Sequence, residues 1–388
     1  MRILCHAQHL SGVGHFVRMH ALACGLNAAG HEVHLVEGGR PVPHLRDAAE
    51  PQVVPLPPLA RSGGSLVALG STAPVCSVIE ERARELARAV ERIRPDVLLI
   101  DHYPFSKWEL DLEIAAAIDA GRACNPAIRV LCSLRDIVRQ TRYERADSQA
   151  YEERVLAQLR ARFDGILVHA DPAFTRIEEH FGRCDDFPVG VEYTGFVTHP
   201  LPAESGASAA GPHAVLSCGG GAGSLAFLRA AMEAFRRLAS GGAVGSMQLI
   251  VFASAAADIS ELEELETAAG NGPFQIRRFG PDFERCLHNS AISISRAGYN
   301  TCATLLRSRT RALLAPDPVM SDQGFRARRF AELGLAAVVE GNPPDVGALM
   351  AAVEATLVSP PPRHGFAVDG VARTRALVEA VNTWSSSR

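Results

Sequence analysis

The sequence predicts an α/β protein made of two doubly wound, Rossmann-like domains. Short apolar segments alternate with amphipathic segments along most of the chain, which is typical of parallel sheets covered by helices. The alternation stops in a stretch rich in Pro, Ala, Ser and Gly at residues 199–212 and then restarts. The length of 388 residues also exceeds what one hydrophobic core usually serves.

The individual elements follow from this pattern. In the first half, strands are expected at 2–7, 31–38, 96–101, 128–134, 165–170 and 191–197, with helices at 16–30, 78–93, 112–120 and 151–163. In the second half, strands are expected at 213–218, 247–254, 274–280, 291–295 and 311–316, with helices from 224, 259, 299, 324 and 370. We therefore expect a first domain over 1–198, a linker over 199–212, a second domain over 213–365 and a C-terminal helix within 366–388.

Composition excludes several classes of protein. Hydrophobic residues make up 47% of the chain and charged residues 21%, and the net charge of −4 gives no reason to expect a nucleic-acid partner. The nine cysteines are scattered without a C-x-x-C pair, which argues against a zinc site or a disulfide framework and suits a reducing compartment. The opening residues do not read as a secretory signal, and no apolar run approaches the ~20 residues of a membrane helix. We expect a cytoplasmic protein, with a peripheral membrane contact left open.

A histidine stands at the start of the first helix. Gly12, Gly14 and His15 lie where the first strand should pass into that helix. The positive end of a helix dipole disfavours a protonated imidazole, so His15 should be neutral and able to accept a proton from a hydroxyl group. Capping of the helix is the competing interpretation.

A glycine-rich loop opens the second half. Residues 218–224 read CGGGAGS, directly after a predicted buried strand and before a predicted helix. Exposed backbone N–H groups at such a helix start are suited to a phosphate group, although a plain flexible turn has the same composition. No Gly-Lys-Ser/Thr follows, so the loop is not a P-loop.

Two later turns also carry polar side chains. In SRAGYNT, residues 295–301, Arg296 could pair with a phosphate, while Asn300 and Thr301 could cap a helix or bond to a ligand. Asp322 and Gln323 precede a helix and would suit sugar hydroxyl groups, or the same N-cap role. Because no D-x-D clamp stands on a loop, we expect no Mg²⁺ site.

Polar turns follow two predicted strands of the first domain. They are DHYP at 101–104 and Arg135-Asp136, and both should point toward the ligand edge of the sheet. Asp101 or Asp136 could orient His15, and a local ion pair would explain Arg135-Asp136 equally well. The acceptor-side candidates are Arg135, His102 and Tyr103.

The order and spacing of these motifs resemble a known family. Gly14-His15 with Arg18, then SLRD at 133–136, then GYNT at 298–301 and the Asp322-Gln323 pair are similar to the MurG-like branch of the GT-B glycosyltransferases, and especially to bacterial predicted glycosyltransferases. The resemblance implies two Rossmann-like domains facing each other across a cleft, with the C-terminal helix returning to the N-terminal domain.

The resemblance also implies a nucleotide-sugar donor, UDP-linked, held mainly by the second domain, with no metal and no further cofactor. The donor-binding residues that it implies are Gly14, Gly220, Gly221, Gly223, Ser224, Phe279, Arg296, Gly298, Asn300, Thr301, Thr304, Asp322 and Gln323. One position departs from the family, because Thr304 stands where a glutamate usually contacts the ribose. The departure implies either a weaker ribose contact or a nucleotide other than UDP.

We therefore expect an inverting, metal-independent glycosyltransferase in which His15, oriented by Asp101 or Asp136, is the general base, and whose acceptor is unknown. Three alternatives stay open. Residues 14–33 also resemble the opening of PseG, a nucleotide-sugar hydrolase of similar fold. A UDP-N-acetylglucosamine 2-epimerase and a non-catalytic nucleotide-sugar-binding subunit share the architecture.

Overall fold

The computed structural model describes residues 1–10, 12–40, 42, 50–62, 64–138, 145–199, 211–219, 224–255 and 257–381. The chain divides into two compact units. Unit 1 comprises 1–41, 46–198 and 367–388, and unit 2 comprises 42–45 and 199–366. Most of the expected linker, residues 200–210, lies outside the described residues.

The described part of unit 1 contains a seven-stranded sheet in which all neighbouring strands are parallel. Its order is β3-β2-β1-β6-β7-β8-β9. The strands are β1 (Arg2–His6), β2 (Glu32–Glu37), β3 (Gln52–Pro55), β6 (Val97–Asp101), β7 (Arg129–Leu134), β8 (Gly165–Val168) and β9 (Val191–Tyr193). Every residue of β6 is buried, as expected for a central parallel strand covered on both faces.

Helices and a small hairpin complete unit 1. The helices are α1 (Gly14–Ala28), α2 (Val75–Ile93), α3 (Asp111–Cys124), α4 (Arg145–Arg162) and α11 (Gly370–Glu379), and the antiparallel hairpin is β4 (Leu59–Ser62) with β5 (Ser65–Ala68). Helix α2 buries one apolar stripe and ends where Arg94 adopts a left-handed conformation ahead of Pro95.

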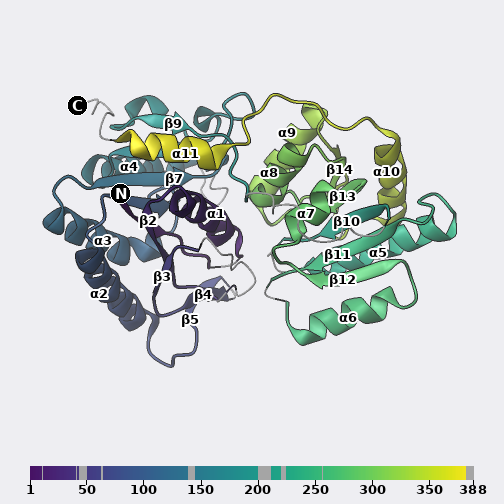
Figure 1. The fold of residues 1–388 in the computed structure, drawn as a ribbon, viewed down its shortest axis with the longest axis horizontal. Helices are drawn as coiled ribbons and strands as arrows, with labels where there is room; N and C mark the ends of the chain where they lie inside the picture. The colour runs from purple at the N-terminus through teal and green to yellow at the C-terminus, as the bar shows by residue number, and fades with distance from the viewer. Residues whose placement is uncertain are drawn as a thin grey trace. The chain divides into compact units, whose positions relative to one another are not determined.

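The last helix of the chain packs on the first. Figure 1 shows α11, in yellow, beside α1, in dark purple. A Cβ atom on Gly25 of α1 would lie only 2.1 Å from Cγ1 of Val371, so this close approach depends on the glycine. The C-terminal helix thus belongs to the N-terminal fold, as the sequence predicts.

Unit 2 repeats the topology of unit 1. Its described residues form a sheet of six strands, all paired in parallel, in the order β12-β11-β10-β13-β14-β15. The strands are β10 (His213–Ser217), β11 (Gln248–Ala253), β12 (Phe274–Arg278), β13 (Ile292–Ser295), β14 (Ala312–Leu314) and β15 (Ala337–Val338). Two doubly wound sheets confirm the predicted α/β fold class.

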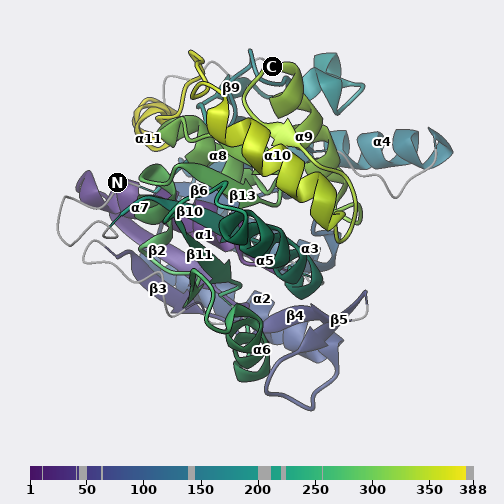
Figure 2. The ribbon, with the colours of Figure 1, turned by 90° about the vertical axis from the view of Figure 1, so that its right-hand side faces the viewer.

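Helices pack on the sheet of unit 2. They are α5 (Ser224–Ser240), α6 (Ile259–Ala269), α7 (Phe283–His288), α8 (Tyr299–Ser308), α9 (Ser321–Glu332) and α10 (Val346–Val358). Helices α5 and α10 lie side by side in Figure 2, and their apolar residues share one core with strands β10 and β11. Phe227, Phe235 and Val353 are among its fully buried members.

In each sheet the strand order reverses beside the first strand. The reversal lies between β1 and β6 in unit 1 and between β10 and β13 in unit 2. Loops that leave adjacent strands in opposite directions open a crevice at their carboxyl ends, where doubly wound proteins bind ligands. The topology therefore points to His15 and Asp101 in unit 1, and to the loops after Ser217 and Ser295 in unit 2.

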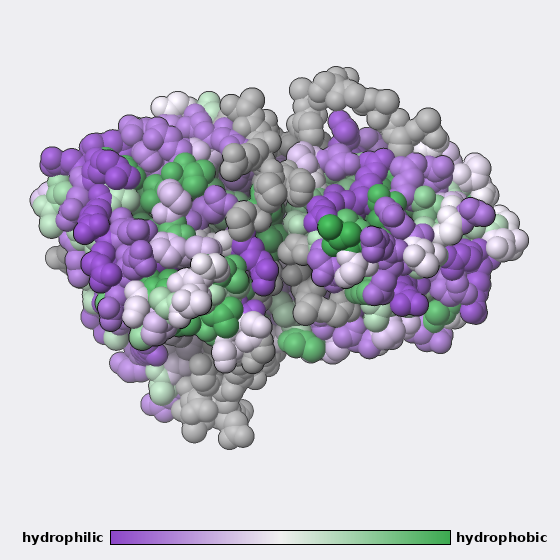
Figure 3. Space-filling view, turned by 90° about the horizontal axis from the view of Figure 1, so that it is seen from below, coloured by the Kyte–Doolittle hydropathy of each residue, from purple (hydrophilic) through white to green (hydrophobic). Residues whose placement is uncertain are grey.

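On the face in Figure 3, apolar side chains are interspersed with hydrophilic ones. Among the described residues, no helix is both long and apolar enough to span a lipid bilayer.

Candidate active site

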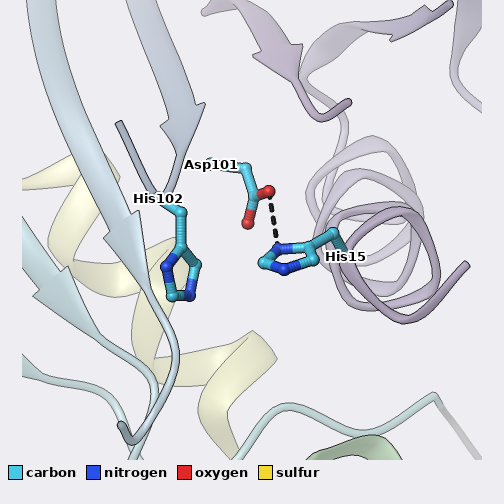
Figure 4. Close-up of side chains that lie close together, drawn as sticks. All are labelled: His15, Asp101 and His102. Atoms are coloured by element: carbon cyan, nitrogen blue, oxygen red, sulfur yellow. Dashed lines mark ion pairs between the residues drawn. The ribbon is translucent and has the colours of Figure 1, made fainter. Parts of the chain in front are cut away.

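His15 and Asp101 meet at the reversal point of unit 1. His15 is the second residue of α1, which follows β1, and Asp101 is the last residue of β6, which pairs with β1. Nδ1 of His15 lies 2.9 Å from Oδ2 of Asp101. Figure 4 shows the carboxylate between the imidazoles of His15 and His102.

Two cations contact the same carboxylate. The guanidinium of Arg18, one turn along α1 from His15, donates to Oδ1 of Asp101, and Nζ of Lys107 donates to Oδ2. Asp101 and Arg18 have fully buried side chains, and that of Lys107 is 10% exposed. Burial alone would raise the pKa of Asp101, but His15, Lys107 and Arg18 together hold that pKa well below its usual value.

His15 is uncharged in this environment. Burial and the positive charges of Arg135 and Lys107 lower its pKa to about 3, against the opposing effect of Asp101. The side chain keeps 26% of its surface exposed, so the ring is accessible as well as neutral. Because the Asp101 charge is already matched by Arg18 and Lys107, a third positive charge on His15 is unfavourable.

The position of Asp101 favours one tautomer of His15. A neutral imidazole carries its proton on the nitrogen that faces a carboxylate, so Nδ1 is protonated and Nε2 holds the lone pair. The imidazole of His15 can then remove a proton from a hydroxyl group or a water molecule, and the carboxylate of Asp101 stabilises the imidazolium that forms.

His102 lies edge-on to His15. The ring centroids are 4.8 Å apart, and Nε2 of His102 accepts a hydrogen bond from the backbone N–H of Arg135 at 3.2 Å. Burial is the main cause that holds the pKa of His102 well below its usual value. Its φ of +60° is rare for a residue with a Cβ, so the loop after β6 holds a strained backbone beside the site.

A buried hydrogen-bond chain supports the site from below. The guanidinium of Arg18 donates to the carbonyl of Ser133 at 3.2 Å, and the hydroxyl of Ser133 lies 2.8 Å from Nε2 of His169. Nδ1 of His169 lies 2.8 Å from the hydroxyl of Thr194. Nη2 of Arg18 donates to both Asp101 and Ser133, so the chain connects the carboxylate at the end of β6 to residues at the ends of β7, β8 and β9.

Within the described residues, His15, Asp101 and His102 are the one group whose potential metal-binding atoms all lie within 4.8 Å of one another. Both oxygens of the carboxylate already contact cations, Arg18 on one and Lys107 on the other. A divalent cation would add charge where positive charge is already in excess. The residues present therefore fit a proton-transfer site better than a metal site.

The structure also places the other residues of unit 1 that the sequence analysis singled out. Gly14 begins α1. Asp136 is buried, and the orienting contact to His15 comes from Asp101. Tyr103 was expected on the acceptor side, but this is wrong. Its side chain is fully buried, and its hydroxyl donates to Asp111 at the start of α3.

The expected phosphate loop of unit 2 is only partly described. Gly220, Gly221 and Gly223 lie outside the described residues, and Ser224 begins α5. Gly298 immediately precedes α8 with an ordinary φ of −71°, and no described atom lies within 4 Å of a Cβ placed on it. Asn300 and Thr301 lie in the first turn of α8. The phosphate-binding role of this loop and turn stays a prediction.

Arg296 already has partners within the protein. Its Nη1 donates to the carbonyls of Ala315 at 3.0 Å and Pro316 at 3.2 Å, and Nη2 donates to Oδ1 of Asn342 at 2.6 Å. The guanidinium carbon lies 4.4 Å from the ring centroid of Phe227, and the residue is 4% exposed. No described contact supports the expected phosphate role, and those that exist link β13 to the segment after β14.

The remaining expected donor contacts lie on loops and helix starts. Asp322 pairs with Arg326 at 3.1 Å, and the side-chain oxygen of Gln323 accepts from the backbone N–H of Asp317 at 3.0 Å. The ring of Phe279 packs on Phe283, with centroids 5.1 Å apart. The sugar and base contacts assigned to these residues stay predictions.

A carboxylate that the sequence analysis missed lies next to Thr304. The Thr304 hydroxyl donates to the carbonyl of Asn300 at 3.0 Å and lies 3.4 Å from Oε1 of Glu284 on α7. Burial raises the pKa of Glu284 to about 7, although Arg307 opposes the shift. No sequence spacing pairs these two residues, because they meet only through the packing of α7 on α8.

Lys107 and one buried cluster of unit 1 were also missed. Lys107 contacts Asp101, and His6, Arg82 and Glu113 form a buried ion-pair cluster at the end of β1. The distance between Nε2 of His6 and Oε1 of Glu113 is 2.8 Å. The one available signal was that Lys107 is the sole lysine of the chain.

Comparisons with known proteins agree with this architecture. Residues 214–361 match the glycosyltransferase family 28 C-terminal domain. No curated protein matches the sequence.

Solved structures of glycosyltransferases match nearly the whole chain. The calicheamicin glycosyltransferase CalG4 is 15% identical, with a TM-score of 0.59 over 99% of this chain and 98% of that one. The spinosyn forosaminyltransferase SpnP is 15% identical, with a TM-score of 0.60 over 99% and 95%. The glycosyltransferase VinC, in complex with dTDP, is 17% identical, with a TM-score of 0.57 over 99% and 96%. At these identities the likeness establishes the GT-B fold.

The matched domain occupies unit 2, where the sequence predicts the donor, and the proton-transfer pair occupies the reversal point of unit 1. The chain therefore has the fold of the GT-B glycosyltransferases, and its residues 214–361 match the glycosyltransferase family 28 C-terminal domain.

Proposed function

We propose that the protein is an inverting, metal-independent glycosyltransferase that moves a sugar from a UDP-linked donor to an acceptor hydroxyl group. The observation that carries this proposal is the contact between His15 and Asp101 at the carboxyl ends of β1 and β6. A neutral, accessible imidazole backed by a carboxylate is the group that deprotonation of an alcohol requires.

The proposed reaction has one chemical step. Nε2 of His15 takes the proton of the acceptor hydroxyl while that oxygen attacks the anomeric carbon from the face opposite the nucleotide. The bond to the diphosphate oxygen breaks, UDP leaves with the electron pair, and the anomeric configuration inverts. Asp101 stabilises the imidazolium, which later returns its proton to solvent.

The donor is proposed to bind unit 2. The family 28 match to residues 214–361 supports this placement, as does the glycine-rich sequence ahead of α5. Uracil is the base expected from the MurG-like motifs. VinC was solved with dTDP, so thymine is the competing base that a binding assay must include.

Metal independence rests on the charges around Asp101. Arg18 and Lys107 already occupy the two oxygens of the carboxylate that could otherwise hold an ion. In the proposed reaction the charge of the departing diphosphate is met by backbone N–H groups at helix starts rather than by Mg²⁺.

The decisive experiment measures nucleotide release with and without acceptors. UDP release from UDP-glucose and UDP-N-acetylglucosamine is followed in EDTA, alone and with a panel of hydroxylated small molecules, peptides and lipids. A transferase releases UDP rapidly only with an acceptor, whereas full release with water alone identifies a hydrolase. A thermal-shift series with UDP, dTDP, GDP and CDP identifies the base, because a ligand of the native state raises the melting temperature.

A further inference from the structure

Lys107 is the sole lysine of the chain, and it contacts the carboxylate of the proposed active site. The sequence contains 39 lysine and arginine residues, and all the others are arginine. Nζ of Lys107 donates to Oδ2 of Asp101, the same oxygen that lies 2.9 Å from Nδ1 of His15.

Burial alone does not explain why this position carries a lysine. Arg18, Arg82 and Arg326 are at most 1% exposed, so the fold readily accommodates buried arginines. A guanidinium is a planar fork that spans both oxygens of a carboxylate, whereas an ammonium is a compact point charge that meets one. Because Arg18 occupies Oδ1, a compact charge at Oδ2 leaves room for His15 on the same oxygen.

The backbone holds Lys107 in place. Its φ is +63°, and it immediately precedes a short 3₁₀ helix at Trp108–Leu110. His102, on the same short loop after β6, has a φ of +60°. Non-glycine residues with such values are rare and persist where the surrounding structure demands them, so the loop has a defined shape that directs Nζ to Asp101.

We propose that Lys107 is a positioning residue, which acts through Asp101 to keep the imidazole of His15 uncharged and directed at that carboxylate. The inference rests on the proposed role of His15 as general base. It assigns Lys107 an electrostatic function that arginine, with its forked geometry, performs less well.

The sign of the effect follows from the charged and titratable groups around the pair. These groups come from five places in unit 1: helix α1, strand β6 and the loops after β1, β6 and β7. They are His9, His15, Arg18, Asp101, His102 and Arg135. The one negative charge of Asp101 faces the positive charges of Arg18, Lys107 and Arg135. Removal of the Lys107 charge leaves more of the Asp101 charge for His15 and raises the pKa of that imidazole.

The single lysine makes its charge state directly measurable. Protein labelled with lysine carrying ¹³C at Cε gives one lysine signal, whose shift reports the protonation of Nζ. We expect the shift of a charged ammonium at pH 7.5, with a midpoint below the ordinary value because burial lowers the pKa of Lys107. A neutral amine at pH 7.5 would overturn the proposal.

The effect on His15 is measured without any assay of activity. The His15 signal is identified in histidine-labelled protein by its loss in His15→Gln. In Lys107→Met we expect the titration midpoint of His15 to rise by about one pH unit or more, and in Lys107→Arg we expect that midpoint to rise less. Arg176→Met removes an exposed charge paired with Glu178 and should leave the midpoint unchanged. Equal midpoints in Lys107→Met and wild type would contradict the proposal.

Activity gives a further, separate readout. The acidic limb of the pH profile of kcat/KM should move to higher pH in Lys107→Met, and Lys107→Arg should restore part of the shift. A lower kcat with an unmoved limb would mean that Lys107 is merely structural. Lys107→Gln serves if the methionine variant melts early. Should no acceptor be turned over, the proposed function fails, while the His15 midpoint still tests the electrostatic role of Lys107.

Discussion

Asp101 contacts His15 at 2.9 Å through one carboxylate oxygen and Arg18 through the other, so a single side chain joins the partly exposed imidazole to the buried core of unit 1. This relationship sets the first two predictions, because each partner can be removed separately.

His15→Gln should lower turnover by roughly 10²–10⁴-fold, because glutamine keeps a polar group but cannot accept the proton near neutral pH. The donor is proposed to bind unit 2, so the dissociation constant of UDP should stay within a few-fold of wild type. Steady-state kinetics and calorimetric titration with UDP measure the two effects. Full activity of His15→Gln would contradict a catalytic role and leave His15 with only a structural role at the start of α1.

Asp101→Asn should also lower kcat, because an amide cannot stabilise the imidazolium and pairs poorly with Arg18 and Lys107. Asp136→Asn is the matched comparison, since Asp136 is also buried and follows the next strand of the sheet. We expect the titration midpoint of His15 to shift in Asp101→Asn and to stay unchanged in Asp136→Asn. An equal shift in both variants would reassign the orienting role.

Glu284 should make stability depend on pH. Burial raises its folded-state pKa to about 7, above the unfolded value of about 4.3, so the folded state retains a proton that the unfolded state has released. The free energy of unfolding should therefore fall as pH rises from about 4.5 to 7 and then level off.

Glu284→Gln tests this directly, because glutamine keeps the shape of the protonated side chain. Urea unfolding at pH 5 and pH 8 should show a smaller loss between the two values in the variant than in wild type. Thr304→Val, which removes the neighbouring hydroxyl but no titrating group, is the control. Parallel losses in wild type and Glu284→Gln would contradict the assignment.

Arg296→Ala should destabilise unit 2 by about 3 kcal/mol, because it leaves the carbonyls of Ala315 and Pro316 and the amide of Asn342 without their charged donor. Urea unfolding measures this loss. The affinity for UDP, taken at a temperature where the variant is folded, then shows whether the residue has any separate phosphate role.

Gly25→Ala should destabilise the docking of α11. Alanine normally stabilises a helix interior by about 1 kcal/mol, but here its Cβ would lie 2.1 Å from Cγ1 of Val371. Overpacking of this kind costs about 1–3 kcal/mol, so the net effect should be a lower melting temperature. Gly25→Ala combined with Val371→Ala should recover stability, and failure to recover would exclude a steric cause.

The sequence predicts the fold well because strand and helix periodicities are strong in both units. It misses the short strands β3, β4, β5 and β15 and the helices α7 and α10. Around β3 and β4, Pro51, Pro55, Pro57 and Pro58 interrupt any alternation. The sequence also places the start of α9 three residues late, at Gly324 rather than Ser321.

The active site was only partly predictable for a geometric reason. His15 can be found because it follows the first strand and opens a helix. Asp101 and Asp136 each follow a buried strand, and only the order of the sheet separates them, since β6 pairs with β1 and β7 does not. Likewise, the sequence around Arg296 does not reveal that its guanidinium donates to a carbonyl after β14.

The attachment of α11 to α1 makes unit 1 a discontinuous domain, assembled from both ends of the chain around an intervening unit 2. During synthesis, every residue of unit 2 is made before the last helix of unit 1. The rest of unit 1 therefore leaves the ribosome without the helix that covers α1. A protein truncated before Gly370 should expose the apolar face of α1, and a circular permutant that joins α11 directly to β1 should let unit 1 fold as one continuous piece.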